Sequence, residues 1–476
     1  MSVSCTEAGQ RPGSRWVALA ALYLAMFMNI LDVSVVNLAL PSIQANVGAS
    51  DTELEWVLVV YVLTFAAGLL PFGRFGDVLG RKRLFLWGVA GFTASSLMCG
   101  LAPDIQTLIG ARGLQGLCGA MMVPQVLAIV HVLFTGEEKG RAMGLFGAVS
   151  ALGAVAGPLV GGVLVSADLF GLGWRPIFLI NLPIGLVSIV GALRFLPELQ
   201  VDRRLTPDWT GTALFAAAVL ALVFPLVEGR QFGWPLWCYG LIGLGCVFGG
   251  LFYGQQRHRY KRAQPQLLPI PLTRDAVFVC GVLFIALFFS AMAGMFFMLA
   301  IFLQAGQGHT PLVAGLLLAP HPVGVILAST LTGRLGTRWL NGRIVISCLI
   351  VLCGLVALRA TVSAQLAEAF FLVSLLAVGL GVGTGIPALF QLVLSRVSGS
   401  DAGAGSGVLQ AFQQIGMALG IAIQGQIFFG GLGASWKEGA FPEAAAVTLI
   451  YPVGVLAGLL AVAWVVWWRF RRTPDN

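Results

Sequence analysis

Residues 16–41 read WVALAALYLAMFMNILDVSVVNLALP, an apolar run that contains one charged residue, Asp32. A run of about 20 apolar residues is long enough to cross the hydrocarbon core of a bilayer as a helix. A carboxylate at that depth is costly and is kept mainly where it serves a function. The other Asp and Glu residues are expected in loops or at helix ends, so Asp32 is predicted to be the only deep carboxylate.

The rest of the chain has the same character. Of its 476 residues, 58% are hydrophobic and only 10% are charged, whereas soluble domains carry about 25% charged residues. Backbone polar groups in lipid must be bonded within their own segment, so apolar runs predict helices. We therefore expect an all-α polytopic membrane protein with fourteen spans. They are predicted near residues 16–41, 55–72, 84–101, 105–133, 142–165, 175–196, 209–227, 236–253, 276–303, 312–335, 344–359, 367–394, 403–429 and 445–468.

The distribution of basic residues predicts the orientation. With a cytoplasmic N-terminus, 23 of the 28 Lys and Arg fall on the cytoplasmic side, four fall on the opposite side, and Arg112 lies inside a helix. This is the positive-inside bias of membrane proteins. It predicts a bacterial inner-membrane protein with both termini in the cytoplasm. It also accounts for the net charge of +8 through anionic lipid, so no nucleic acid is expected as a partner.

Several functional classes lack their sequence signals. No G-x-x-x-x-G-K-[ST] phosphate loop occurs, and neither CxxC nor a Cys/His metal spacing is present;. No nucleophile–base constellation stands out, so the protein is not expected to be an enzyme. We expect no cofactor and no metal, and uphill work must draw on a proton gradient.

Five glycine and proline positions recur with identical spacing in the two halves of the chain. Gly116, Pro124, Gly144, Gly153 and Gly157 reappear 263 residues later as Gly379, Pro387, Gly407, Gly416 and Gly420. A looser echo pairs residues 73–77 with 333–337, at an offset of 260. Duplicated membrane halves that rock about a midplane site are typical of secondary transporters.

The duplication predicts a domain organisation. Two pseudo-symmetric six-helix bundles are expected, at residues 16–197 and 276–468. Two additional central helices with their cytoplasmic loops would occupy residues 198–275, and short cytoplasmic tails would occupy residues 1–15 and 469–476.

Four motifs, in order, resemble those of the major facilitator superfamily. GRFGDVLGRKR at 73–83 resembles its signature loop, with Val78 where a basic residue is usual. RGLQG at 112–116 resembles its helix-4 arginine motif, and GAVAGPLVGG at 153–162 resembles its antiporter motif. LDVSVVNLALP at 31–41 resembles the helix-1 motif of the fourteen-helix drug:proton antiporters, with Ser34 where Thr is usual. The resemblance implies the major facilitator fold and multidrug efflux.

Asp32 and Arg112 are expected at similar depth in the membrane. At 1.5 Å per residue, they lie about 13 Å and about 10 Å from the outer ends of their helices. Buried charges are usually paired or face water. We expect Asp32 to bind a proton or a cationic substrate, with Arg112 favouring its ionised form when close. A static structural ion pair is the alternative.

Other polar residues inside the predicted spans are candidates for the substrate pathway. They are Asn29, Asn37, Gln115, Gln410, Gln413, Gln414 and His321. Intramembrane amides can also simply bridge helices. An imidazole titrates near neutral pH, so His321 is either a second protonatable group or a neutral packing residue.

Two motifs predict moving parts. Gly73, Asp77, Gly80 and Arg81 are expected to form a conformational latch at a tight cytoplasmic turn, unless the basic residues there only fix the topology. Gly153, Gly157, Pro158, Gly161 and Gly162 predict a kinked seam of close helix contact that seals one side of the membrane, although the same residues also suit ordinary packing.

The combined prediction is a monomeric, proton-coupled antiporter that exports lipophilic drugs or antibiotics by alternating access. With one deep carboxylate, the expected substrates are neutral or monocationic. The partners would be the small lipophilic substrate, protons and the bilayer. Two alternatives remain open, a dedicated exporter of a single metabolite or antibiotic and a non-transporting membrane scaffold or receptor. The glycine-rich motif at 153–162 disfavours an importer.

Overall fold

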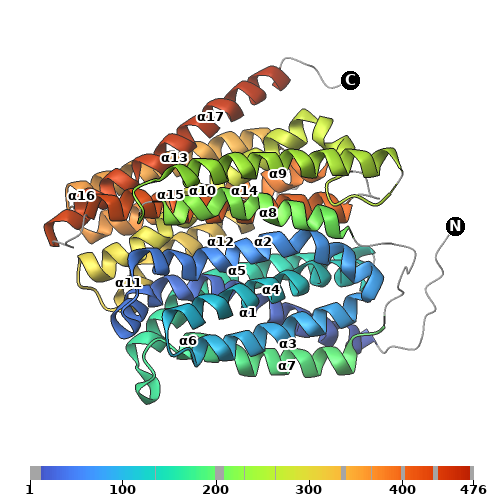
Figure 1. Ribbon diagram of the computed structural model, residues 1–476, viewed down its shortest axis with the longest axis horizontal. Helices are drawn as coiled ribbons and strands as arrows, with labels where there is room; N and C mark the ends of the chain where they lie inside the picture. The colour runs from blue at the N-terminus through green and yellow to red at the C-terminus, as the bar shows by residue number, and fades with distance from the viewer. Residues whose placement is uncertain are drawn as a thin grey trace.

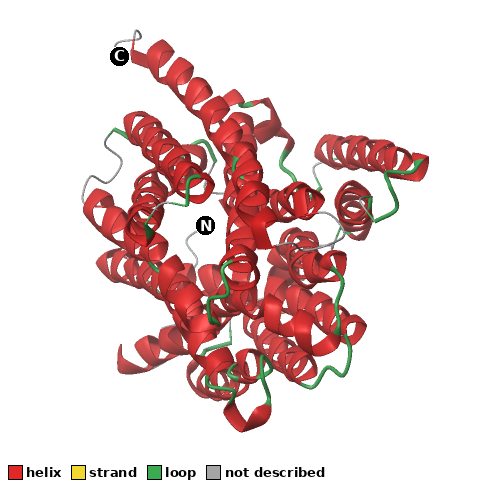
Figure 2. Cartoon of the chain, turned by 90° about the vertical axis from the view of Figure 1, so that its left-hand side faces the viewer, coloured by secondary structure: helices red, strands yellow, loops and turns green. Residues whose placement is uncertain are grey.

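The computed structural model describes residues 12–134, 136–198, 208–229, 231–262, 264–333, 339–365, 367–397, 402–432 and 438–471. Within these ranges every regular element is helical (Figures 1 and 2). The long helices lie side by side along the horizontal axis of Figure 1. The α-helices are α1 (Pro12–Val47), α2 (Asp51–Leu79), α3 (Arg81–Gly100), α4 (Ile105–Leu133), α5 (Gly136–Ser166), α6 (Pro176–Leu179), α7 (Asn181–Phe195), α8 (Trp209–Glu228), α9 (Leu236–Lys261), α10 (Ala276–Ile301), α11 (Pro311–Leu318), α12 (Pro320–Gly333), α13 (Leu340–Ser363), α14 (Glu368–Leu394), α15 (Ala402–Leu432), α16 (Phe441–Thr448) and α17 (Ile450–Arg471).

Twelve helical segments among the described residues are long and apolar enough to cross a membrane;. They are α1, α2, α4, α8, α9, α10, α13, α14, α15 and the consecutive pairs α6–α7, α11–α12 and α16–α17. The other two long helices fall short on this criterion. α3 has 20 residues but is less apolar, and α5 contributes only the shorter apolar segment Ala156–Ser166. The predicted count of fourteen spans is therefore not confirmed.

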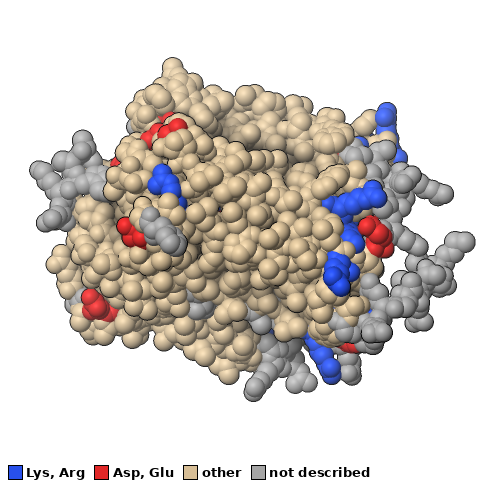
Figure 3. Space-filling view, turned by 90° about the horizontal axis from the view of Figure 1, so that it is seen from below, with Lys and Arg blue, Asp and Glu red and all other residues tan. Residues whose placement is uncertain are grey.

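Charge is segregated along the molecule as a membrane requires. On the face seen in Figure 3, most Lys and Arg gather at one end, and a broad band without charged side chains separates them from the other end. A lipid bilayer would surround the uncharged band.

The helices form two groups with a hairpin beside their junction. α1 packs against α5 and α7, and α4 packs against α2 and α3; the second group joins α10 to α15, α12 to α14, and α13 to α14 and α17. The groups meet where α2 contacts α15 and where α5 contacts α11. The hairpin of α8 and α9 lies at this junction, because α8 contacts both α2 and α15.

The turn between α2 and α3 is shorter than expected. The helix α2 continues through Gly73 to Leu79, so Gly80 alone links it to α3. Gly80 has φ +100°, a conformation that favours glycine;. Beyond the other end of α3, Asp104 caps the start of α4. Its carboxylate accepts a hydrogen bond from the N–H of Thr107, which lowers the pKa of the carboxyl group;.

The repeated glycines make equivalent contacts in the two groups. A Cβ on Gly116 of α4 would overlap the carbonyl oxygen of Tyr61, and a Cβ on Gly379 of α14 would overlap that of His321. Tyr61 and His321 are 260 residues apart, as are the two GRxG segments of the sequence. A Cβ on Gly157 would overlap Oγ of Ser34, and a Cβ on Gly420 would overlap the carbonyl oxygen of Ser290; the two serines are 256 residues apart. Close helix approach at small residues is the usual mode of packing in membranes.

Candidate functional site

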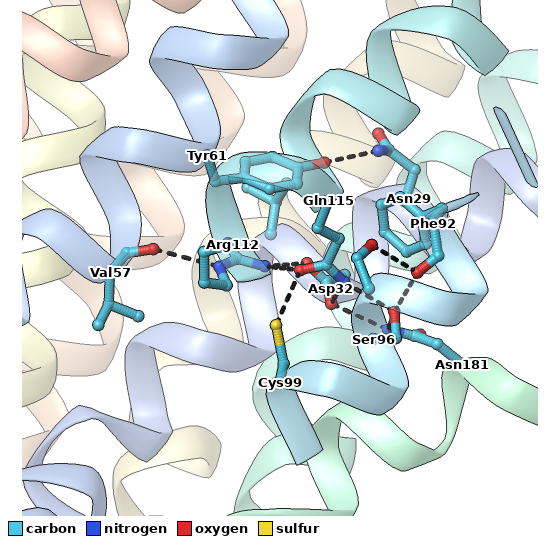
Figure 4. Close-up of polar contacts among 12 residues, drawn as sticks. Asn29, Asp32, Val57, Tyr61, Phe92, Ser96, Cys99, Arg112, Gln115 and Asn181 are labelled. Atoms are coloured by element: carbon cyan, nitrogen blue, oxygen red, sulfur yellow. Dashed lines mark hydrogen bonds and ion pairs between the residues drawn. The ribbon is translucent and has the colours of Figure 1, made fainter. Parts of the chain in front are cut away.

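A buried polar cluster surrounds Asp32, whose side chain has no exposed area (Figure 4). Arg112 Nη1 of α4 lies 2.5 Å from Asp32 Oδ2. Asp32 Oδ1 accepts hydrogen bonds from Gln115 Nε2 at 2.8 Å and from Asn181 Nδ2 at 2.9 Å. Both amides also donate to Ser96 Oγ of α3, at 2.8 Å and 3.2 Å. All three described partners of Asp32 are donors, two from α4 and one from α7;.

Arg112 is fixed on several sides. Its Nε donates to the carbonyl of Val57 at 3.1 Å, and its Nη1 also donates to Gln115 Oε1 at 2.6 Å. The ring of Tyr61 lies 4.3 Å from the guanidinium carbon, within cation–π range;. A buried pair with this many hydrogen bonds offsets part of the desolvation cost of both charges.

The polar cluster belongs to one half of the molecule only. Ser34 and Ser290 are 256 residues apart, and the same offset makes Phe288 the counterpart of Asp32. Gly116 and Gly379 are 263 residues apart, and this offset makes Leu375 the counterpart of Arg112. Both counterparts are buried apolar side chains, at 1% and 0% exposure. The duplicated frame therefore carries a charged pair in one half and an apolar core in the other.

A cavity of about 230 Å³ lies between the two helix groups, next to this cluster. Its wall comes from α1, α2, α4 and α5 on one side and from α10, α11, α12 and α15 on the other. Most of the wall is apolar. Its polar residues are Ser34, Asn37, Tyr61, Arg112 and His321. Drug-sized ligand pockets occupy roughly 300–1,000 Å³, so a larger compound requires the halves to separate.

The structure brings together some of the predicted pathway residues. Gln115 bonds to Asp32, Asn37 lines the cavity, and Asn29 donates to Tyr61 Oη at 2.6 Å. His321 also lines the cavity, where its ring meets Phe296 edge-on with centroids 4.6 Å apart.

The predicted glutamines of α15 are placed differently. Gln410, Gln413 and Gln414 are half-buried and are not among the residues of the cavity wall. They are likewise not among the residues that hydrogen-bond to Asp32.

The glycine-rich stretch of α5 packs in two directions. A Cβ on Gly153, Gly157 or Gly161 would press on Ile30, Ser34 or Val35 of α1, respectively. Gly162 instead faces Pro311 and Leu312 of α11, and a Cβ on Gly315 of α11 would overlap the carbonyl oxygen of Pro158. The stretch thus packs against α1 of its own half through one face, and against α11 of the other half through an adjacent face.

The predicted latch is described only in part. Arg81 Nη1 donates to the carbonyl of Ala128 in α4 at 3.0 Å, a bond within the first half. Among the described residues, a Cβ built on Gly73 would meet nothing within 4 Å apart from its own helix backbone. The side chain of Asp77 lies outside the described residues.

Three candidate functional residues were not predicted from the sequence. Asn181 and Ser96 belong to the Asp32 cluster but lie outside every motif of the sequence. Glu55 is fully buried in α2, and a Cβ on Gly425 of α15 would lie 2.5 Å from its Oε1. The described residues therefore include a second buried carboxylate besides Asp32; that Asp32 is the only carboxylate deep in the membrane stays a prediction. α2 begins at Asp51, capped by Ser50, which places Glu55 one turn inside the helix rather than at its end.

Comparison with known proteins gives a consistent result. A family model described as "Major Facilitator Superfamily" matches residues 22–421. A probable actinorhodin transporter of Streptomyces coelicolor is 40% identical over 448 residues, which are 91% of this chain and 77% of that protein. The puromycin resistance protein pur8 of Streptomyces alboniger is 33% identical, covering 95% and 91%. The multidrug resistance protein Stp of Mycobacterium tuberculosis is 34% identical, covering 90% and 79%.

Solved structures match at the level of the fold. A peptide transporter POT in complex with sulfate has a TM-score of 0.68 at 15% identity, covering 95% of this chain and 94% of that chain. A bacterial homolog of the human lysosomal transporter Spinster, in an inward-facing and occupied conformation, has a TM-score of 0.64 at 18% identity, covering 96% and 97%.

Proposed function

The chain belongs to the Major Facilitator Superfamily, and we propose that it exports lipophilic drugs or antibiotics in exchange for protons. Relatives named for transport of, or resistance to, antibiotics support the export of such compounds. The proposed substrates are neutral or monocationic, and the proposed mechanism is alternating access about the cavity between the helix groups. As a member of a transporter family, the protein is not an enzyme.

One observation carries this proposal. Arg112 is at once a residue of the cavity wall and the ion-pair partner of Asp32. A change at Asp32 therefore reaches the cavity through a single side chain. The cavity contacts both helix groups, so its occupant would sense their relative motion;.

The coupling step follows from the donors around Asp32. The ionised carboxylate holds Arg112 in place while substrate occupies the cavity from the cytoplasmic side. When the site opens outward, Asp32 Oδ2 accepts a proton and its attraction for Arg112 weakens. Arg112 then moves toward the cavity and displaces the substrate. On return to the cytoplasmic side Asp32 releases the proton, and the pair closes again.

The α5 seam supports separation of the two sides. Gly162 and Pro158 bring α5 against α11 without intervening side chains, and Ser166 Oγ accepts the N–H of Leu312 at 3.1 Å. We propose that this contact between the halves closes the outer end of the cavity. Gly73, Asp77, Gly80 and Arg81 would act as the latch at the opposite end.

The protein is a multi-pass membrane protein. We further propose fourteen spans, because α3 packs between α4 and α7, and α5 between α1 and α11, parallel to helices that meet the criterion. The proposed setting is the bacterial inner membrane, with a monomer whose termini are both cytoplasmic. The gathering of Lys and Arg at one end of the molecule supports such an orientation;.

Two alternatives make different demands. A dedicated exporter of one metabolite or antibiotic would share the machinery and differ in the breadth of its substrates. A scaffold or receptor would need neither a cavity between duplicated halves nor a buried charged pair beside it.

The decisive experiment is transport in proteoliposomes with an imposed pH gradient and a panel of dyes and antibiotics. Wild-type protein should move several compounds against their gradient, and Asp32→Asn should not, while remaining folded in the membrane. Transport of one compound only favours the dedicated exporter. Undiminished transport by Asp32→Asn contradicts the proposed role of Asp32.

A further inference from the structure

Tyr61 and His321 occupy equivalent positions in the two halves. They are 260 residues apart, and the backbone carbonyl of each lies against the equivalent glycine, Gly116 or Gly379. Both side chains line the cavity, one from α2 and the other from α12. The duplicated frame thus places two polar aromatic residues at related points of the cavity wall.

The partners of these two residues differ. The hydroxyl of Tyr61 accepts a hydrogen bond from Asn29, and its ring covers the guanidinium of Arg112. The counterpart of Asn29, at the offset of 256, is Ile285, and the counterpart of Arg112 is Leu375. Both are fully buried apolar side chains. His321 therefore has none of the neighbours that satisfy Tyr61.

His321 Nε2 is buried and has no hydrogen-bond partner among the described residues. A buried polar atom without a partner lowers stability, and native proteins rarely retain one without a functional reason. The ring packs against Phe296, and the backbone of His321 packs against Gly379. The residue lines the cavity while Nε2 is covered, so a rotation of the ring would present this unsatisfied nitrogen to a polar group on a ligand.

The other residues of the cavity wall indicate which class of ligand the cavity favours. The wall contains Arg112 but neither Asp nor Glu, and Asp32 lies outside it, already bonded to three donors. A cation would therefore meet a guanidinium and no available carboxylate. The apolar surface and Phe296 favour a flat aromatic body. The polar groups of the wall favour a neutral compound with a hydrogen-bond acceptor.

We propose that His321 is the specificity residue of the cavity, where Nε2–H donates a hydrogen bond to a carbonyl group on a neutral aromatic substrate. The inference rests on the proposed export function and narrows its substrate range to the neutral members. Arg112 provides the coupling to Asp32, and His321 provides the recognition from the other half.

Binding of a matched pair of compounds tests this assignment. 9-Fluorenone and fluorene are planar three-ring compounds that differ in one group, a carbonyl against a methylene. Calorimetric titration of purified protein should give wild type a preference for 9-fluorenone of about 3- to 10-fold, the effect of one neutral hydrogen bond. N-methylacridinium, a planar monocation, should bind more weakly than 9-fluorenone.

The variants separate recognition from structure. His321→Phe keeps a ring against Phe296 and should reduce the preference to about one, while fluorene still binds. His321→Gln keeps a donor and should restore part of the preference. His309→Phe, a substitution at a histidine outside the cavity wall, should leave it unchanged. Thermal unfolding of each variant shows that it is folded.

Three results would overturn the proposal. They are an unchanged preference in His321→Phe, tighter binding of N-methylacridinium than of 9-fluorenone, and no binding of either neutral compound to wild type. A fourth concerns protons: if His321→Phe stops gradient-driven efflux and leaves the binding preference intact, His321 carries protons instead. The binding preference does not depend on a pH gradient, so it can hold even if proton-coupled export fails.

Discussion

Asn181, the first residue of α7, donates its side-chain amide to Asp32 Oδ1 in α1 at 2.9 Å. The two residues are 149 positions apart in the chain, and no motif links them. The bond ties the start of α7 to the carboxylate that we propose as the proton site. The helix α7 therefore contributes to the proposed chemistry as well as to the packing.

Loss of this bond should reduce both stability and transport. Asn181→Ala removes the donors to Asp32 and Ser96, and a hydrogen bond to a charged group contributes about 1.5–3 kcal/mol. We expect a lower unfolding temperature and weaker gradient-driven efflux in proteoliposomes. The matched control is Ser188→Ala in the same helix, whose hydroxyl bonds only to the carbonyl of Ala21. Equal loss of efflux in both variants would count against a role for Asn181 at Asp32.

Replacing both Asp32 and Arg112 by neutral residues distinguishes proton coupling from a static ion pair. Arg112→Gln alone leaves Asp32 uncompensated and should destabilise the protein by about 3–5 kcal/mol. Adding Asp32→Asn should recover most of this loss, since the buried charge is gone. Thermal unfolding measures the recovery. If Asp32 couples protons, the folded double variant shows no gradient-driven efflux. Restored efflux would mean that the pair is structural.

Much of the fold follows from sequence because it rests on local patterns. Apolar runs predict helices wherever they occur, and most of the expected spans coincide with long helices. The contact between Asp32 and Arg112 was expected from helix length alone, since 1.5 Å per residue puts both at similar depth. The recurring glycines predicted two equivalent halves, because glycine is needed at the points where helices pack closely.

The rest depends on three-dimensional packing. Asn181 and Ser96 reach Asp32 only because α3, α4 and α7 converge, which no spacing in the chain reveals. Glu55 was taken for a residue at a helix end because α2 was expected to begin there, whereas Ser50 and Glu53 cap it one turn earlier. Gln410 and Gln414 share a face of α15 with Met417 and Ile421, which line the cavity, but they lie earlier along the helix and are not among the wall residues;.

Gly157 should be intolerant of any side chain. A Cβ at this position would overlap Ser34 Oγ of α1, so Gly157→Ala must push α1 and α5 apart. Overpacking of this kind costs about 1–3 kcal/mol. We expect a lower unfolding temperature and, if α5 seals the cavity, faster proton leak into substrate-free liposomes. Gly249→Ala in α9, where a Cβ meets nothing within 4 Å, is the control and should change neither.

Cysteine labelling tests whether α3 spans the membrane. In a background in which the native cysteines are replaced, Arg83→Cys and Pro103→Cys place thiols near the two ends of α3, at exposed positions. A spanning α3 exposes these thiols on opposite sides. A membrane-impermeant maleimide added outside intact cells should label position 103 alone, and both positions after lysis. Labelling of both in intact cells would exclude a spanning α3.

The hairpin of α8 and α9 should influence the transport rate, because α8 bonds to both halves. Trp56 Nε1 of α2 donates to Glu228 Oε1 at 2.6 Å, and Gln426 Nε2 of α15 donates to the carbonyl of Leu226 at 2.9 Å. When the halves rock, at least one bond must break, and the neutral one is weaker. Gln426→Leu removes that bond and should raise the maximal efflux rate by about 2- to 10-fold without changing KM. Trp56→Phe should lower the unfolding temperature and leave the rate unchanged. A slower Gln426→Leu would show that the bond to α15 persists through the cycle and positions the hairpin.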